Sequence, residues 1–71
     1  MDKLDFLATA YDFKTVDDML DAASIDSIVP GICTEPDCEF VTDVEPDQDK
    51  GHCELCNKKT VQSCLVLAGL I

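Results

Sequence analysis

The first third of the chain carries two short stretches whose apolar residues recur at helical spacing. In the first stretch they occupy positions i, i+3, i+4 and i+7, namely Leu4, Leu7, Ala8 and Tyr11. This spacing is the apolar stripe of an amphipathic helix. Asp2 stands just before it, where its carboxylate can accept a hydrogen bond from an N–H of the first turn. The pattern predicts a helix over residues 3–11.

A second helix is predicted to begin after Thr15, which stands three residues before Asp18. This arrangement resembles a capping box, in which the Thr hydroxyl accepts a backbone N–H and an acidic side chain sits at the third helical position. The apolar face that follows is made of Val16, Met19, Leu20 and Ala23. We expect a helix over residues 16–23 or 16–24. Both helices are too short to be stable alone in water, so they must pack against the rest of the chain.

The middle of the chain alternates less regularly and predicts one strand. Residues 24–32 are expected to be a connector, with Pro30 and Gly31 forming a turn before the first cysteine. Residues 39–45 alternate well enough for a strand. Residues 46–51 are rich in turn formers and acidic groups. We expect them to form the solvated tip of one hairpin that separates the two cysteine pairs.

The C-terminal residues 60–71 fit two patterns. Val61, Cys64, Leu65 and Ala68 have helical spacing, whereas Val61, Ser63, Leu65 and Leu67 have the spacing of a strand. Periodicity alone does not decide the structure of so short an apolar run. We favour a short strand or turn after Cys56, followed by a short helix that ends at Gly69.

Size and charge narrow the classes of protein. With 71 residues the chain forms one domain at most, and a domain of this size is marginally stable without a disulfide, a metal or a partner. Five basic residues oppose fifteen acidic ones, giving a formal net charge of −10. Nucleic-acid-binding domains carry a basic patch that faces the phosphates. The charge therefore disfavours nucleic acid as the partner.

Four cysteines supply the clearest chemical signal in the sequence. Cys33 and Cys38 form one close pair, Cys53 and Cys56 form another, and fourteen residues separate the pairs. Two close pairs joined by a moderate loop have the spacing of a structural zinc site, in which four thiolates surround the ion as a tetrahedron. Asn57 follows the second pair, where such a turn often needs a positive φ, and Asn tolerates this conformation better than most residues. We predict one structural Zn²⁺ bound by these four cysteines.

Residues 33–61 resemble a zinc ribbon, with the order knuckle, strand, turn, knuckle and strand. The acidic helical start, the run Asp43-Val44-Glu45-Pro46-Asp47-Gln48-Asp49, the Cys-x2-Cys pair and the apolar end more loosely resemble small uncharacterised zinc-ribbon proteins of tailed bacteriophages and prophages. The expected fold is a small, metal-stabilised α+β unit. Residues 1–32 would form a helical hairpin and connector, and residues 33–71 the ribbon with its apolar C-terminal strand or helix, all in one folded unit.

Other interpretations of the cysteines stay open. The same residues could form two disulfides or remain free thiols, and iron could occupy a four-thiolate site. His52 precedes Cys53 and could bind the metal or contact a thiolate, although a loop histidine is more often solvated. Cys64 lies in an apolar run, where a buried structural role is commoner than a reactive thiol.

We expect no enzymatic activity, because a metal closed by four cysteines leaves no position for a reacting water. The expected function is a protein-interaction module with an acidic surface, in contact with a protein partner. One alternative is a nucleic-acid-binding ribbon with a local basic face at Lys50, Lys58 and Lys59. A second is a redox or thiol metalloprotein that uses Cys64. The acidic N-terminus does not resemble a signal peptide and no apolar run spans a membrane, so we expect a cytoplasmic protein, in a bacterial host if phage-encoded.

Overall fold

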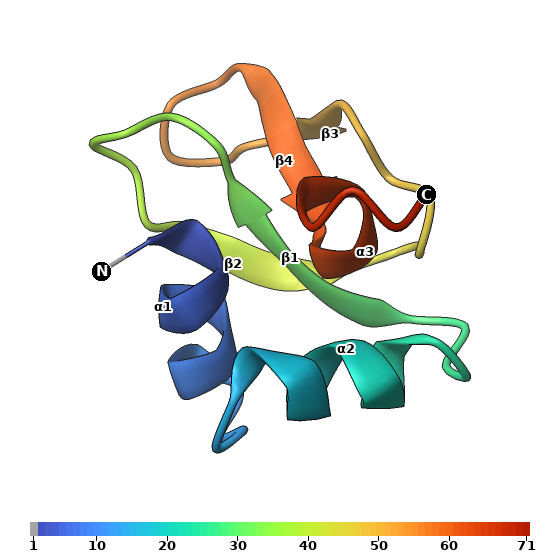
Figure 1. Cartoon of the computed structure of the whole chain (residues 1–71). Helices are drawn as coiled ribbons and strands as arrows, with labels where there is room; N and C mark the ends of the chain where they lie inside the picture. Colours follow the sequence, from blue (N-terminus) through green and yellow to red (C-terminus); the bar gives the residue numbers. More distant parts are fainter. Residues whose placement is uncertain (1) are drawn as a thin grey trace.

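The computed structural model describes residues 2–71, which form three short helices and one four-stranded antiparallel sheet (Figure 1). The helices are α1 (Lys3–Ala10), α2 (Val16–Ala23) and α3 (Cys64–Leu67). The strands are β1 (Val29–Cys33), β2 (Val41–Val44), β3 (Gly51–His52) and β4 (Lys59–Ser63). The strand order is β2-β1-β4-β3, so two hairpins lie side by side and join through β1 and β4. The expected small α+β class is confirmed.

Side-chain caps determine where the first two helices begin. The Asp2 carboxylate accepts a hydrogen bond of 2.9 Å from the N–H of Asp5. The Thr15 hydroxyl accepts one of 3.0 Å from the N–H of Asp18. Both contacts satisfy an N–H that has no partner inside its helix. The predicted starts of these two helices are therefore confirmed.

The first helix ends at Ala10, one residue before the predicted end, because the chain turns at Asp12. Asp12 has a φ of 63°, in the left-handed region. The N–H of Asp12 donates to the carbonyl of Thr9, and the N–H of Phe13 donates to the carbonyl of Ala8 at 2.9 Å. These two bonds form a Schellman ending, which satisfies carbonyls of the last helical turn.

The connector predicted over residues 24–32 is wrong for its last part. Val29–Cys33 is β1, a central strand buried at all five positions. Pro30 and Gly31 belong to this strand and make no turn. Pro30 has no N–H, but pairing with β4 starts only at Gly31, so no hydrogen bond to β4 is lost there. A strand that is buried along its whole length has no alternation of apolar and polar residues. The sequence pattern therefore did not indicate this strand.

Residues 46–50 form a crossover between the two hairpins, so the hairpin tip predicted for them is wrong. Gly51, placed in that tip from the sequence, begins β3 and pairs with Val61 of β4 at the far edge of the sheet. Two hydrogen bonds from Ser63 hold the crossover. Its hydroxyl donates to the carbonyl of Pro46 at 2.6 Å, and its N–H donates to the carbonyl of Gln48 at 2.9 Å.

The C-terminal part contains both elements that its two patterns indicated. β4 ends at Ser63, and the Ser63 hydroxyl accepts the N–H of Val66 at 3.1 Å to cap α3. The chain then turns at Gly69, which has a φ of 76°. The favoured order of strand, short helix and Gly69 is confirmed. No helix among residues 2–71 is long and apolar enough to cross a membrane.

Two clusters of buried side chains stabilise the fold. The helix core consists of Leu7, Ala8, Met19, Ala23, Val29, Ile32, Cys64 and Leu65. The cysteine core consists of Cys33, Cys38, Cys53 and Val61. β1 contributes neighbouring residues to both clusters, Ile32 to the first and Cys33 to the second. The two cores are therefore mechanically linked through the central strand.

A polar contact joins α1 to the edge strand β2. The Tyr11 hydroxyl donates a hydrogen bond of 2.7 Å to a carboxylate oxygen of Asp43. Burial, this hydrogen bond and the negative charge of Asp43 all raise the pKa of Tyr11 above its ordinary value. Tyr11 is therefore held neutral, and its ring covers part of the helix core.

Candidate metal centre

The first cysteine pair lies where the β1–β2 hairpin turns. Cys33 is the last residue of β1, and its N–H donates to the carbonyl of Phe40 at 2.9 Å. Cys38 lies in the intervening loop, where its N–H donates to the carbonyl of Glu35 at 3.1 Å. The loop therefore folds back on itself, and the longer spacing of this pair still allows a tight knuckle.

The second pair lies in the turn of the β3–β4 hairpin. The N–H of Cys53 donates to the carbonyl of Lys58, and the N–H of Asn57 donates to the carbonyl of Cys53, both at 2.8 Å. Asn57 has a φ of 57°. The positive φ predicted for this residue is confirmed, and it lets the chain leave Cys56 towards β4.

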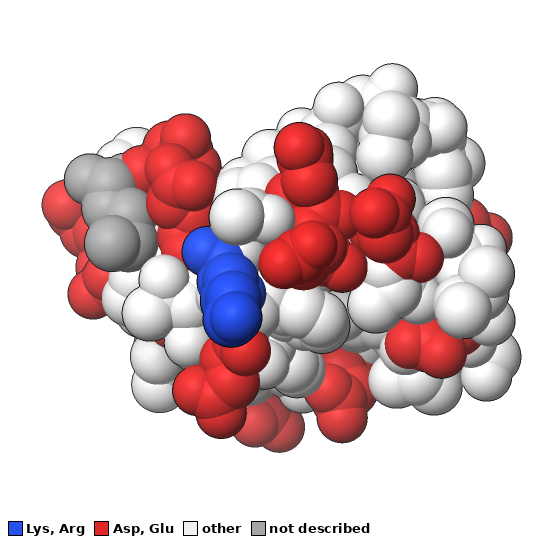
Figure 2. All heavy atoms as spheres, turned by 60° about the horizontal axis from the view of Figure 1, so that its bottom comes forward, with Lys and Arg blue, Asp and Glu red and all other residues white. Residues whose placement is uncertain are grey.

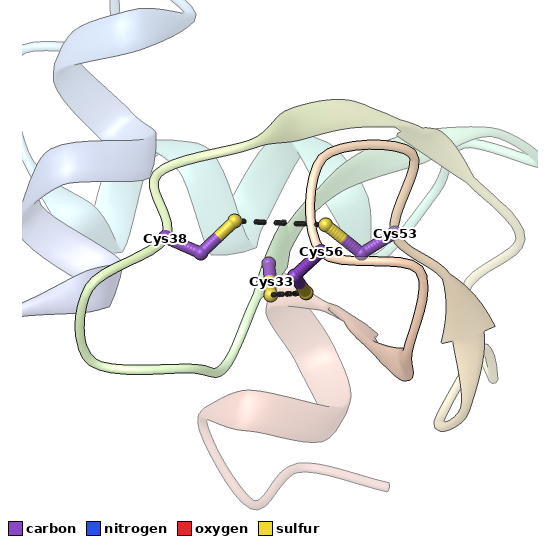
Figure 3. Close-up of side chains that lie close together, drawn as sticks. All are labelled: Cys33, Cys38, Cys53 and Cys56. Carbon is purple, nitrogen blue, oxygen red and sulfur yellow. Dashed lines mark hydrogen bonds between the residues drawn. The ribbon is translucent and has the colours of Figure 1, made fainter.

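The two knuckles bring the four sulfur atoms together. All four Sγ atoms lie within 4.8 Å of one another. Sγ of Cys33 is 3.7 Å from that of Cys56, and Sγ of Cys38 is 3.5 Å from that of Cys53, so each short contact joins one knuckle to the other (Figure 3). Zinc–sulfur bonds of about 2.3 Å in a regular tetrahedron imply sulfur–sulfur distances of about 3.8 Å. The four cysteines are thus positioned to coordinate one metal ion.

No disulfide joins any of the cysteines among residues 2–71. All five cysteines are free thiols. Cys33 and Cys53 are fully buried, Cys38 is nearly so, and Cys56 is partly exposed. Four thiolates gathered in such a place require a positive charge between them, because buried charge without a partner is strongly unfavourable. A bound cation would supply that charge.

Burial and hydrogen bonds shift the pKa values of Cys53 and Cys38 in opposite directions. Burial raises the pKa of Cys53. Hydrogen bonds from the N–H groups of Cys56 and Leu55 and from neighbouring thiols outweigh this effect and lower the pKa to about 7. The N–H of Phe40 lowers the pKa of Cys38, but burial and the Cys53 and Cys33 sulfurs raise it, to about 11. The N–H groups of Cys56 and Leu55 therefore favour the thiolate form of Cys53, whereas burial and the neighbouring sulfurs favour the protonated form of Cys38.

Thr60 is the site residue that the sequence analysis missed. Its hydroxyl lies 2.9 Å from Sγ of Cys33 and 3.8 Å from Sγ of Cys56. Its carbonyl accepts both the N–H and the hydroxyl of Thr34, at 2.8 and 2.9 Å. The sequence carries no local signal for this contact. Its place beside Cys33 depends on the pairing of β1 with β4.

Two lysines contact the first knuckle. The ammonium group of Lys3 donates to the carbonyl of Cys38, which ties α1 to the metal centre. Lys58 lies 3.4 Å from a carboxylate oxygen of Glu35 and joins the two knuckles at the surface. An exposed pair of this kind contributes little to stability, about 0–1 kcal/mol.

Two residues considered from the sequence lie outside the sulfur cluster. His52 is exposed on β3 and is not among the ligand atoms that the structure gathers from residues 2–71. Cys64 is fully buried in the helix core, and its pKa is raised by that burial. Its predicted role as a small apolar core residue is confirmed.

Comparisons of the chain with models of protein families, with curated proteins and with solved structures give no match. The similarity to a zinc ribbon therefore rests on the four clustered cysteines and on the two hairpins that carry them. The resemblance to phage proteins has no support from these comparisons.

Proposed function

We propose that the four cysteines bind one Zn²⁺ ion with a structural role, and that the protein is not an enzyme. The observation that carries this proposal is the convergence of four Sγ atoms from two separate hairpins within 4.8 Å. Zinc suits such a site because it favours four-coordinate tetrahedral thiolate ligands and undergoes no redox chemistry. Four protein ligands would fill its coordination shell, so the ion would join the hairpins and take no part in a reaction.

Metal analysis of the protein purified under reducing conditions tests this proposal. We expect one zinc per chain in wild type and in Cys64→Ala, whose sulfur lies outside the cluster, and no stoichiometric zinc in Cys53→Ser. If iron were found at the same stoichiometry, the result would favour the redox alternative over the structural zinc site. Wild-type protein without bound metal, or a requirement for Cys64, would contradict the four-cysteine centre.

We further propose that the protein acts by binding another protein through its acidic surface. Every Asp and Glu except Glu35 is exposed. Figure 2 shows one face where acidic side chains form several separate patches and lysine occupies one small area. Lys58 lies beside Glu35, which balances its charge locally. A basic protein surface is the partner whose charge complements this one.

The resemblance to small phage zinc-ribbon proteins suggests where to look for that partner. It motivates the proposal that the chain acts in the cytoplasm of a bacterial host and contacts a host protein. The acidic surface supports a basic target and opposes the alternative of a nucleic-acid-binding ribbon, because phosphate would be repelled.

Binding measurements at low salt separate a protein partner from nucleic acid. We expect no binding of metal-bound protein to single- or double-stranded DNA or RNA at micromolar concentration. We expect a captured protein partner to be released as salt is raised, because the Debye length falls from about 30 Å at 0.01 M to about 3 Å at 1 M. Saturable DNA or RNA binding that is lost in a Lys50→Gln, Lys59→Gln double variant would instead favour the nucleic-acid alternative.

A further inference from the structure

The Thr60 side chain lies against two of the four sulfur atoms, on the side where the first hairpin meets the second. Its hydroxyl is 2.9 Å from Sγ of Cys33 and 3.8 Å from Sγ of Cys56. These two cysteines come from different knuckles, and their sulfurs are 3.7 Å apart. Thr60 therefore contacts the edge of the sulfur tetrahedron that joins the hairpins.

Hydrogen bonds from Thr34 hold the backbone of Thr60 in place. Thr60 lies within β4, and its carbonyl accepts two hydrogen bonds from Thr34, one from the N–H and one from the hydroxyl. Thr34 directly follows Cys33. The segment that carries the first ligand is thus bonded to the residue whose hydroxyl reaches that ligand.

Metal binding determines the direction of the hydrogen bond. In the free thiol either Cys33 or Thr60 can donate. A cysteine that binds a metal does so as a thiolate and has no proton left, so its sulfur can only accept. The Thr60 hydroxyl must then donate to Sγ of Cys33, and a bond from a hydroxyl to an anion is stronger than one between neutral groups.

We propose that Thr60 is a positioning residue of the metal centre, whose hydroxyl orients Cys33, disperses its thiolate charge and thereby strengthens metal binding. This inference rests on the proposed four-cysteine metal site. Hydrogen bonds to metal ligands from outside the coordination shell commonly change affinity by 10–100-fold. For one hydroxyl and one principal contact we expect a loss of about 10-fold in affinity in Thr60→Val.

The test uses the full chain with Co²⁺ and Zn²⁺ as probes. Thr60→Val keeps the branched shape and removes the hydroxyl, whereas Thr60→Ser keeps the hydroxyl. Affinity is measured by competition with a chelator, and the sulfur-to-cobalt charge-transfer band reports electron density on the thiolates. We expect Thr60→Val to bind about 10-fold more weakly, with the band moved to lower energy because the sulfur has lost a donor. Thr60→Ser should restore both properties.

Thr34→Val is the matched control. It removes the hydrogen bond from the Thr34 hydroxyl to the carbonyl of Thr60, and this hydroxyl makes no hydrogen bond to a sulfur. We expect it to leave the charge-transfer band unchanged. Equal loss of affinity in Thr34→Val and Thr60→Val, with the wild-type band in both, would overturn the inference and assign Thr60 a packing role. A Thr60→Val protein with wild-type affinity and band would also overturn it, while the metal site would stand. Wild-type protein that binds neither ion would instead refute the proposed site itself.

Discussion

A strong chelator should unfold the reduced protein. Structural zinc contributes about 10–16 kcal/mol of binding free energy in zinc-finger peptides, and that energy is also folding energy. A domain of this length has a total stability of only about 4–11 kcal/mol, from about 0.05–0.15 kcal/mol per residue. Loss of the proposed ion would therefore remove an amount comparable to the whole free energy of unfolding. We expect circular dichroism to show loss of the sheet and helices, and re-addition of zinc to restore them.

The loss should reach the helices, because the two cores share the central strand. Cys33 belongs to the cysteine core, and its neighbour Ile32 belongs to the helix core. The carbonyl of Cys38 also accepts a hydrogen bond from the Lys3 ammonium group, so the first knuckle restrains α1. Neither helix is long enough to be stable without packing. The chain should therefore unfold as one unit when the knuckles open.

Variants distinguish loss of the metal from loss of a cysteine in general. Cys53→Ser replaces a fully buried sulfur of the cluster and should unfold the protein even when zinc is present. Cys64→Ala removes a fully buried sulfur of the helix core and should cost about 1 kcal/mol while the protein stays folded and metal-bound. A chain that keeps its sheet and helices after complete metal removal would show that the four cysteines are not what stabilises this fold.

Local chemistry explains which features could be predicted from the sequence. The caps at Asp2 and Thr15 act within one turn, so residues three apart reveal them. The positive φ of Asn57 follows from its place directly after Cys56. The four clustered cysteines also come as two local pairs, and their spacing alone indicates that each pair forms one corner of a candidate site. These features needed no knowledge of the distant parts of the chain.

The features that were missed depend on contacts between distant residues. β1 looked like a connector because Pro30 and Gly31 are turn formers, yet burial by neighbours on both sides makes them part of a strand. The crossover of residues 46–50 is held by Ser63, which comes thirteen or more residues later in the chain. Thr60 reaches Cys33 only after β1 and β4 pair. No local pattern encodes these pairings.

The central strand offers a sharp test of this packing at Gly31. A Cβ atom built on Gly31 would lie 2.6 Å from Cγ2 and 2.9 Å from Cγ1 of Val44, and 3.2 Å from the carbonyl oxygen of Gln62. Val44 is a stiff side chain that packs against both cores, and the oxygen belongs to the backbone of β4. Neither neighbour can withdraw easily. Gly31 is therefore required by the close approach of the β2 side chain, although its backbone is that of an ordinary strand.

Gly31→Ala should destabilise the metal-bound protein by about 1 kcal/mol. Overpacking of a filled interior costs about 1–3 kcal/mol, whereas the lower entropy of the unfolded chain with Ala returns only about 0.4–1 kcal/mol. The cost of the clash is larger than this gain, so the free energy of unfolding should fall. Urea unfolding of the zinc-loaded protein measures the change, which should appear as a lower midpoint with an unchanged slope.

Val44→Ala identifies the clash as the cause. This change removes both methyl groups that the new Cβ would meet, so the double variant Gly31→Ala, Val44→Ala should be about 1 kcal/mol more stable than the sum of the single changes implies. Gly69→Ala is the control, because a Cβ there meets nothing within 4 Å and the cost arises from its φ of 76° alone. Its effect should add to that of Val44→Ala without coupling. A Gly31→Ala protein as stable as wild type would mean that the Val44 side chain does not lie this close to Gly31.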